Sequence, residues 1–394
     1  MTSEWRTIRA ADFIDFNPRL SLKKGAIATK IAMDKLKPFS KKVPETEKAE
    51  FNGGAKFCNG DTVMARITPC LENGKTAYVD MLDDGEIGFG STEFIVMRAK
   101  TGVSDPQFVY YTAINPVFRN VAIKSMVGSS GRQRVQQSVL EELELSVPDL
   151  NEQRRIGAFL AGLDEKIALN NRINDNLEQQ AQSYFQELFV DNADPKWATG
   201  TISDLGAVIG GSTPSKAKPE YYTEAGIAWI TPKDLSINKS KFISHGENDI
   251  TELGLKNSSA AIMPEGTVLF SSRAPIGYIA IAAGEVTTNQ GFKSVTPKPE
   301  IGTPFVYFFL KHNLPVIEGM ASGSTFKEVS GSTMKNVPAV IPDFESLSRF
   351  NDFCAPIFAQ QRILEEQNHS LATLRDELLP KLMSGEINVS DISL

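Results

Sequence analysis

Two arginines in this sequence have the chemistry and the setting to contact a nucleic acid. Arg66 and Arg273 each follow a β-rich run and stand shortly before a proline. An arginine held by a turn can make paired hydrogen bonds to a guanine edge or to a phosphate. The sequence pattern places the two arginines at equivalent positions of two related segments. The alternative is a structural arginine that pairs with a nearby carboxylate, and the sequence leaves both readings open.

Three loops combine glycine with hydroxyl, amide and cationic side chains. They run from Gly128 to Arg134, from Gly210 to Lys216 and from Gly323 to Lys327. Such loops suit contacts to phosphates and base edges, and a plain solvated loop is the alternative for each. The candidate DNA-binding residues in these loops, around the two arginines and near Asn289 are Arg66, Thr68, Lys75, Ser129, Ser130, Arg132, Gln133, Arg134, Thr213, Ser215, Lys216, Arg273, Asn289, Gln290, Lys293, Ser324, Thr325 and Lys327.

Residue patterns for catalysis or metal binding are missing from the sequence. It has only three histidines, no two of them close together, and three widely spaced cysteines that fit reduced thiols better than a disulfide framework or a zinc site. Neither a nucleophile elbow nor a phosphate-binding P-loop occurs. The short glycine pattern at Gly88 and Gly90 is interpreted as a turn. No catalytic residue and no metal site are predicted.

One acidic pattern resembles a nuclease motif. Pro148 and Asp149 are followed by Asp164, Glu165 and Lys166, which fits a loose proline-aspartate, then acidic-x-lysine arrangement. The second half of the chain does not repeat it. Because the later three residues fall between the apolar positions of a helical pattern, a solvated helix face is predicted for them.

Two long segments repeat apolar residues at alternating spacings of four and three. This spacing, sustained over many turns, is typical of a coiled-coil seam, and an ordinary helical bundle is the alternative. Both seams turn polar near the middle, at Asn170 and Asn174 and at Gln361 and Asn368, which would fix register. The apolar seam residues are Ile156, Leu160, Leu163, Ile167, Leu177 and Leu188 in the first segment and Phe350, Ile357, Leu364, Leu371, Leu378 and Leu382 in the second.

The sequence contains an internal repeat, and the second copy follows the first by about half the length of the chain. FVYY at Phe108 returns as FVYF at Phe305, and each copy leads through a proline-aspartate pair into its long helical segment. The pattern predicts an α+β fold with pseudo-twofold symmetry: two similar mixed α/β domains, residues 1–150 and 191–342, separated by a long antiparallel two-helix coiled coil from residues 151–190 and 343–394. Strands are expected at 62–67, 76–82, 93–99, 143–149, 227–230, 267–272, 277–283 and 293–297, and helices at 108–126, bent near Pro116, and 303–313.

Composition narrows the class of protein. The net charge is −7, so DNA binding would need local basic patches or charge from partners. The apolar content of 41% is typical of globular protein. No apolar run is long enough to cross a bilayer and the N-terminal residues have no signal core, so a cytoplasmic protein without membrane contact is expected.

The order of these features resembles the DNA specificity subunits of type I restriction-modification systems. GGSTPSKAKPEYYTEAGIAWITPKDL (residues 210–235) resembles the start of a target-recognition domain, and GDTVMARITPCLENGK and GFGSTEFIVMRA resemble another variety of it. VPDLNEQRRIGAFLAGLDEKI and LRDELLPKLMSGEI resemble segments that the family shares. The first domain lacks a clear glycine-threonine-proline opening. The second helix begins with DFESLSRF rather than with the proline-leucine-glutamate-glutamine type of sequence that is usual in the family. The two domains are therefore expected to read different sequences.

The resemblance implies a function. Each target-recognition domain would read one half of a bipartite site in double-stranded DNA, while the helices set the gap and dock two methyltransferase subunits. Motor-nuclease subunits would complete the complex. The chain itself would bind no cofactor, and S-adenosylmethionine, ATP and Mg are expected on the partner subunits. The alternatives are a protein-binding coiled-coil adaptor without DNA recognition, and an enzyme that acts on nucleic acid itself, for which a carboxylate cluster or a methylase motif would be needed.

Overall fold

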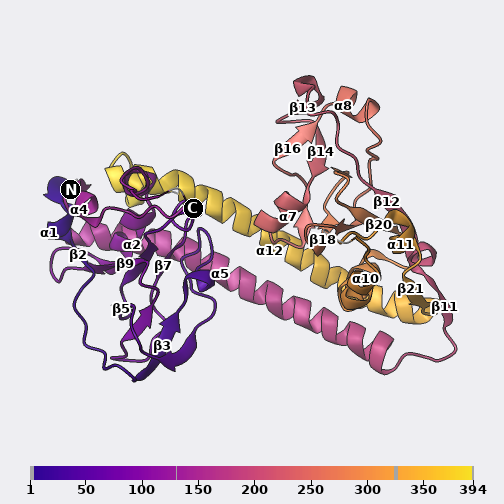
Figure 1. Ribbon diagram of the computed structural model, residues 1–394, viewed down its shortest axis with the longest axis horizontal. Helices are drawn as coiled ribbons and strands as arrows, with labels where there is room; N and C mark the ends of the chain where they lie inside the picture. Colours follow the sequence, from indigo (N-terminus) through magenta and orange to yellow (C-terminus); the bar gives the residue numbers. More distant parts are fainter. Residues whose placement is uncertain (1–3, 130, 324–326, 393–394) are drawn as a thin grey trace. The chain divides into compact units, whose positions relative to one another are not determined.

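The computed structural model describes residues 4–129, 131–323 and 327–392. It divides into two compact units, one formed by Met1–Leu169 with Asn368–Leu394 and the other by Asn170–Gln367. Each unit holds a mixed α/β body and part of both long helices (Figure 1). Helix α5 (Leu150–Gln186) starts in the first unit and ends in the second, and α12 (Phe344–Ser384) does the reverse.

The first unit contains two four-stranded sheets and a two-stranded ladder. Their strand orders are β2-β9-β6-β7, β4-β3-β8-β5 and β1-β10. The predicted strands at 62–67, 76–82, 93–99 and 143–149 are confirmed as β6, β7, β9 and β10. The elements are β1 (Arg6–Arg9), α1 (Ala10–Phe13), β2 (Ile14–Phe16), β3 (Ile27–Ile31), β4 (Glu47–Glu50), β5 (Ala55–Phe57), β6 (Thr62–Ala65), β7 (Thr76–Tyr78), β8 (Gly88–Gly90), β9 (Phe94–Ala99), α2 (Pro106–Ile114), α3 (Pro116–Lys124), α4 (Gln137–Glu141) and β10 (Glu144–Val147).

The turn predicted at Gly88 and Gly90 is wrong, because both residues lie in the buried strand β8. A Cβ on Gly88 would stand 2.6 Å from the Phe57 ring, and one on Gly90 would stand 2.5 Å from the Ile31 carbonyl oxygen. These glycines therefore allow neighbouring groups to approach a strand closely. The sequence pattern alone does not separate that use of glycine from a turn.

A proline divides the helical segment that follows β9, as predicted. Helix α2 begins after Asp105, whose carboxylate accepts hydrogen bonds from the first amides, and α3 begins at Pro116 after the capping side chain of Asn115. The buried face of α2 packs with β6, β7 and β9. Ile156 and Leu160 of α5 and Leu382 of α12 join the same core. The globular body and both long helices therefore share one hydrophobic core in the first unit.

The second unit contains a five-stranded sheet, β12-β20-β17-β18-β15, a four-stranded sheet, β13-β16-β14-β19, and the ladder β11-β21. The strands predicted at 227–230, 267–272, 277–283 and 293–297 are confirmed as β14, β17, β18 and β20. The elements are β11 (Ala198–Thr201), α6 (Ile202–Leu205), β12 (Gly206–Gly210), β13 (Tyr222–Thr223), β14 (Ile227–Ile230), α7 (Pro232–Ile237), β15 (Phe242–Ile243), β16 (Asn248–Ile250), α8 (Glu252–Lys256), β17 (Val268–Ser272), β18 (Ile276–Ala282), β19 (Thr287–Thr288), β20 (Lys293–Pro297), α9 (Thr303–His312), α10 (Leu314–Gly319), α11 (Gly331–Lys335) and β21 (Pro338–Ile341).

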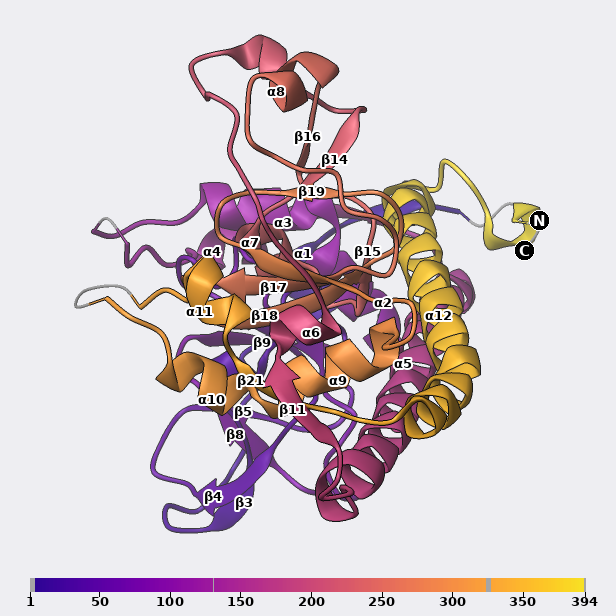
Figure 2. The ribbon, with the colours of Figure 1, turned by 90° about the vertical axis from the view of Figure 1, so that its right-hand side faces the viewer.

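Aromatic residues of α9 and of both long helices meet in the main core of the second unit. Helix α9, which matches the predicted helix at 303–313, packs against β17 and β18 (Figure 2). The ring of Phe305 on α9 lies 5.8 Å from Phe185 of α5, and the ring of Phe308 lies 6.1 Å from Phe350 of α12. The second body is thus joined to both long helices by apolar packing, as the first is.

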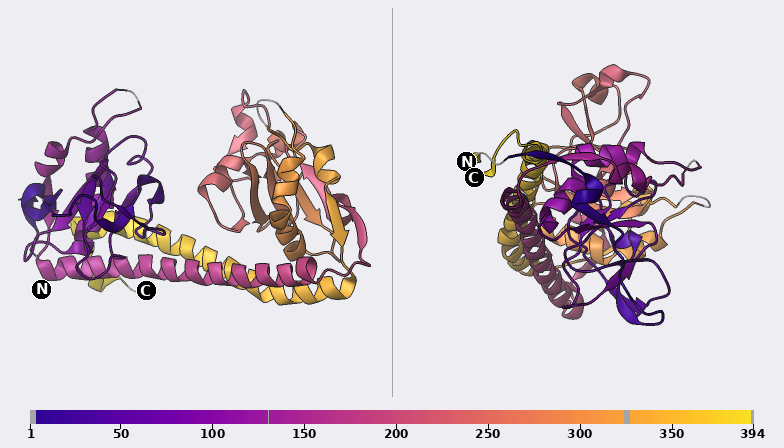
Figure 3. Two further views of the ribbon diagram at one scale, coloured as in Figure 1. Left: turned by 60° about the horizontal axis from the view of Figure 1, so that its bottom comes forward. Right: turned by 90° about the vertical axis from the view of Figure 1, so that its left-hand side faces the viewer.

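The two long helices pack against each other within each unit (Figure 3). In the second unit, α5 meets α12 at Asn170–Gln367, Asn174–Gln361 and Phe185–Phe350. The first numbers rise while the second fall, so the helices run antiparallel there. Every predicted apolar seam residue is buried or half-buried: Ile156, Leu160, Leu163, Ile167, Leu177, Leu188, Phe350, Ile357, Leu364, Leu371, Leu378 and Leu382.

The close approach at β8 gives a first prediction. Gly90→Ala should lower the free energy of unfolding by about 1–3 kcal/mol, because the added methyl group meets a backbone oxygen that cannot move aside easily. Gly162→Ala on α5 is the control, since its Cβ would have no neighbour within 4 Å. It should leave stability equal or raise it by up to about 1 kcal/mol. Thermal and urea unfolding measure both, and equal stabilities of the two variants would contradict the packing argument.

Candidate nucleic-acid interface

A hairpin that carries several predicted DNA-binding residues is held firmly at its base in the first unit. The backbones of Val127 and Arg134 exchange hydrogen bonds of 3.0 and 2.9 Å. The amide of Thr68 donates to the carbonyl of Gln133, and the Thr68 hydroxyl accepts from the Gln133 amide, each at 3.0 Å. The Arg134 guanidinium binds both carboxylate oxygens of Glu93, at 2.9 and 2.6 Å. Three of the predicted residues therefore brace the hairpin.

The tip of this hairpin projects into solvent. Ser129 and Arg132 are exposed, and the Arg132 amide donates to the Ser129 carbonyl at 3.0 Å. Ser130 lies outside the described residues, as do Ser324 and Thr325 of the matching loop. A charged tip on a braced base is suited to reach a DNA backbone or groove.

The second unit repeats this hairpin base with the charges exchanged. The backbones of Ser322 and Glu328 exchange hydrogen bonds of 3.1 and 2.9 Å. Here the carboxylate is on the hairpin: Glu328 pairs with Arg273 at 3.5 Å and lies 3.8 Å from Lys293. Arg273 thus has the carboxylate partner that the alternative reading required. Its side chain remains about one-third exposed, so one partner does not remove it from solvent.

The predicted equivalence of Arg66 and Arg273 is wrong by one residue. The Val135 amide donates to the Arg66 carbonyl, and in the second unit the Val329 amide donates to the Ser272 carbonyl. Arg66 therefore matches Ser272. Thr62 and Val268, at the starts of β6 and β17, also match, so the same offset holds along the whole strand and Arg273 corresponds to Ile67. Because successive strand side chains point to opposite faces, one residue of offset changes where an arginine is aimed.

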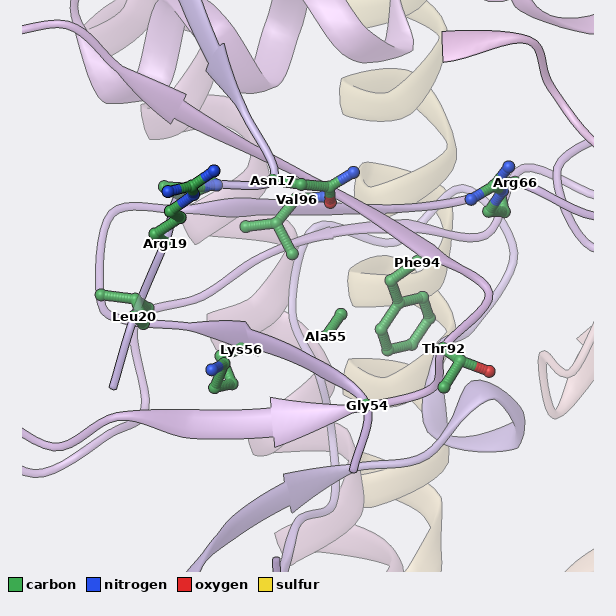
Figure 4. Close-up of a pocket in the computed structure, with 11 residues that line it drawn as sticks. Asn17, Arg19, Leu20, Gly54, Ala55, Lys56, Arg66, Thr92, Phe94 and Val96 are labelled. Carbon is green, nitrogen blue, oxygen red and sulfur yellow. The ribbon is translucent and has the colours of Figure 1, made fainter. Parts of the chain in front are cut away.

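Arg66 lies beside a cationic hollow of about 600 Å³ in the first unit. Figure 4 shows Arg19 and Arg66 on opposite sides, with Lys56 also at the edge and Phe94 between. Among the described residues, these three cations form no ion pair and no carboxylate lines the hollow. The buried Nε of Arg66 also lacks a hydrogen-bond partner there. The hollow therefore offers positive charge to an anion.

Arg19 and Lys56 were not among the sequence predictions. Both come from short segments without a glycine-hydroxyl pattern, so only the folded chain brings them to Arg66. Asn17 contributes to the placement of Arg19, since it adopts a positive φ of 49° and exchanges backbone and side-chain hydrogen bonds with Val96, at 2.7 and 2.9 Å. An asparagine before a proline at the end of a strand is the sequence signal for such a turn.

Candidates in the second unit gather around the loop after β12. The Thr213 hydroxyl donates to the Gln290 side chain, and Lys293 donates to the Gln290 carbonyl at 3.4 Å. Gly211 has to be glycine, since a Cβ would lie 2.0 Å from the Asn289 carbonyl oxygen. These contacts link Thr213, Gln290 and Lys293 into one surface that continues through Glu328 to Arg273.

The remaining candidates divide between structural and exposed positions. Lys75 is half-buried and donates to the Met33 carbonyl at 2.9 Å, which is a structural role. Asn289 accepts from the Gly291 amide at 2.8 Å and shapes its own turn. Ser215, Lys216 and Lys327 are exposed on loops, where their side chains are open to a ligand.

The solvated helix face predicted at Asp164 is wrong, because this carboxylate is buried. Asp164 pairs with Arg375 of α12 at 2.6 Å and accepts a hydrogen bond of 2.5 Å from the Tyr111 hydroxyl of α2. Tyr111 in turn accepts from the Lys41 ammonium at 3.2 Å. Burial lowers the pKa of Lys41 to about 8. The apparent nuclease pattern is therefore part of a polar contact between the first body and the long helices.

A similar contact lies inside the second unit. Lys241 pairs with Glu178 of α5 at 2.5 Å and donates to Gln361 of α12 at 2.7 Å. Glu178 also pairs with Lys311 at 2.5 Å. Burial alone would raise the pKa of Glu178, but Lys241 and Lys311 outweigh it and hold that pKa below its ordinary value. Neither contact was predicted, because no sequence pattern marks a lysine as buried.

Within residues 4–129, 131–323 and 327–392, no three His, Cys, Asp or Glu side chains gather in a way that could hold a metal ion. The same ranges contain no helix with the length and apolar character needed to cross a membrane.

Comparisons with known proteins agree on one family. The sequence model of one protein family, described as type I restriction modification DNA specificity domain, matches residues 3–179 and again residues 195–368. The MjaIX specificity subunit of Methanocaldococcus jannaschii is 40% identical over 47% of this chain and 45% of its own length. The HindI specificity subunit of Haemophilus influenzae is 24% identical over 83% of this chain and 86% of its own. The fold resembles the crystal structure of an S subunit from M. genitalium, with a TM-score of 0.59 and 18% identity over 96% of each chain.

The buried ammonium gives a second prediction. Since the pKa of Lys41 is about 8 when folded and 10.5 ordinarily, the unfolded chain binds more protons between these values. The free energy of unfolding of the native protein should therefore rise more steeply with pH in that interval than that of the Lys41→Met variant, whose methionine has no proton to lose. Urea unfolding of both proteins between about pH 7 and about pH 9.5 measures the difference in slope. Parallel curves would show that the Lys41 ammonium is not desolvated.

Proposed function

Because this chain belongs to the family of type I restriction modification DNA specificity domains, we propose that it selects the DNA sequence on which a type I restriction-modification complex acts. Two copies of the domain are present, so each body reads one half of a bipartite site. The observation that carries this proposal is the duplicated hairpin, braced at its base and placed beside cationic residues in each unit.

In the first body, the hairpin tip with Arg132 and the hollow with Arg66 supply donors and positive charge. Arginine in such positions pairs with phosphates or with a guanine edge. In the second body, Arg273 and Lys293 are partly neutralised by Glu328, and hydroxyl and amide groups of Thr213 and Gln290 stand nearby. The two reading surfaces differ in charge and in donor pattern, so they read different base sequences.

The long helices supply the second part of the proposal. Each body is packed onto both helices within its unit, so the helix length fixes how far apart the half-sites are. The exposed faces of the helices dock two methyltransferase subunits, and motor-nuclease subunits join the complex. The chain carries out no catalysis, and S-adenosylmethionine, ATP and Mg are bound by the partners.

An adaptor that binds only proteins is the less favoured function. It would use the helices but would leave the braced hairpins of both bodies, and the cationic residues beside them, without a role. Selection of binding sequences from random duplex DNA by the full chain with its methyltransferase partners tests the proposal. A bipartite consensus with a constant unspecified gap is expected, and recovery of no consensus, or of one continuous motif, would overturn it.

The hollow in the first body gives a third prediction. Arg66→Ala should weaken binding by about 1–3 kcal/mol and relax base preference in one half-site only, if the guanidinium reads a base. If it binds a phosphate, affinity should fall for all sequences and the salt dependence should decrease by about one counterion. Competition binding at several salt concentrations separates the two cases. Arg273→Ala should affect the other half-site, and Lys196→Ala, an exposed lysine in the segment before β11, is the control.

An Arg66→Ala protein with native affinity and native base preference would remove Arg66 from the interface. Equal loss at both half-sites, or loss that follows unfolding, would also reject the role. Circular dichroism of each variant keeps these outcomes apart.

Lengthening the helices gives a fourth prediction. One added heptad in α5 between Leu169 and Asn170, with one in α12 between Gln367 and Asn368, lies between the two units and preserves the seam. Seven residues add about 10 Å of helix, equal to about three base pairs. The selected gap should grow by about three base pairs with both half-sites unchanged. A gap of unchanged length would contradict the role of the helices.

A further inference from the structure

Lys41 and Lys241 occupy equivalent places in the two bodies. The carbonyl of Lys41 accepts a hydrogen bond of 2.9 Å from Tyr78 of β7, and the carbonyl of Lys241 accepts one of 2.7 Å from Ile281 of β18. These strands also match, since Tyr78 pairs with Thr62 of β6 and Ile281 pairs with Val268 of β17. A lysine thus stands at the same point of two sheets whose sequences otherwise differ widely.

Both ammonium groups are buried against the same helix of each body. Lys41 is 5% exposed and Lys241 is 7% exposed. The Nζ of Lys41 lies 5.5 and 5.0 Å from the rings of Tyr110 and Tyr111, at the end of the FVYY segment. The Nζ of Lys241 lies 4.6 and 5.4 Å from the rings of the matching FVYF segment, Tyr307 and Phe308. Lysine is rarely buried so fully, so its repetition calls for a reason beyond packing.

Beyond the rings, each ammonium belongs to a polar network that includes both long helices of its own unit. Lys41 reaches Asp164 of α5 through the Tyr111 hydroxyl, and Asp164 is bound by Arg375 of α12. Lys241 binds Glu178 of α5 and Gln361 of α12 directly. In the second unit, Glu365 of α12 also accepts hydrogen bonds from the amides of Lys241 and Phe242, at 2.7 and 3.0 Å.

Such contacts constrain direction more than they stabilise. Removing a charge from water costs about as much as the buried pair returns, so a well-packed apolar contact would serve stability equally well. A buried ammonium, however, has to keep its specific partners, because an unpaired buried charge is costly. Apolar packing holds a body on the helices without requiring particular donors and acceptors to meet. The network adds a penalty for a tilt that separates Asp164 of α5 from the Tyr111 hydroxyl, or Glu178 of α5 from the Lys241 ammonium.

We propose that Lys41 and Lys241 are positioning residues that fix the angle at which each recognition body stands on the long helices, and thereby set which gap between half-sites the protein accepts. The inference rests on the proposed function, since it assigns a role in reading a bipartite site. It concerns the gap alone: neither lysine is placed at the DNA, so the base preference of each half-site is left to the hairpins and the hollow.

Gap preference is the measurement that tests this role. The full chain and its variants are titrated with duplexes that carry the selected half-sites at the native gap or at a gap one base pair longer or shorter. The native protein should prefer the native gap by about tenfold or more, the scale on which one wrong base pair is rejected. Lys41→Met, which keeps the apolar stem, should reduce this preference to about threefold or less. Base substitutions within either half-site should cost as much as before.

Neighbouring lysines supply matched controls. Lys42→Met removes an exposed ion pair with Asp80, and Lys233→Met removes one with Glu247. Both should keep the native gap preference. For the second body, Lys241→Met combined with Glu178→Gln avoids leaving the carboxylate buried beside a methionine. It should lose gap preference as Lys41→Met does.

Each outcome decides the proposal. Unchanged gap preference in Lys41→Met and in the double variant would overturn it, as would loss of gap and half-site discrimination together. If Lys41→Met fails to fold, the double variant decides; if neither folds, the lysines are stability elements and the positioning role is rejected. A native chain with partners that prefers no bipartite duplex would instead overturn the proposed function.

Discussion

A buried lysine at the contact between a globular body and two long helices is the constraint on which each unit depends. Lys41 and Lys241 come from the bodies. Lys241 binds acceptors on both helices directly, while Lys41 connects through the Tyr111 hydroxyl to Asp164 of α5, which Arg375 of α12 also binds. The apolar cores hold body and helices together, but apolar packing is not directional. The polar network adds direction, so the surfaces that carry Arg66 or Arg273 are fixed relative to the helices of their own unit.

Duplication and divergence are both visible at the hairpins. The backbone pattern is the same in each unit, with the hairpin base paired to the end of the strand β6 or β17. The ion pair at this base is reversed, since Arg134 binds Glu93 in one unit and Glu328 binds Arg273 in the other. A repeated backbone with exchanged charges is therefore what the proposed function requires, since it gives two copies of one domain different binding surfaces without a change of fold.

Much of the fold could be predicted because its signals are local. The four-three spacing fixes the long helices, and β-branched runs mark β6, β9 and β17. Burial of Asp164 could not be predicted, because its helical position fits a solvated face and only Tyr111 and Arg375, distant in sequence, make it internal. The burial of Gly88 and Gly90 in a strand could not be predicted either, because the groups that approach them, Phe57 and Ile31, are distant in sequence. Of the cations around the hollow, only Arg66 could be predicted as a candidate, since Arg19 and Lys56 reach it only through the strand arrangement.

Hydroxyl-radical footprinting of the full chain, with its methyltransferase partners, on a duplex that carries its selected site tests the central claim most directly. In the proposed arrangement, two bodies, each fixed on the same pair of helices, read one duplex at two places. It predicts two protected patches, one for each half-site, separated by a stretch of constant length whose bases can be changed freely. A single continuous patch, or a separation that varies between sites bound with equal affinity, would contradict it.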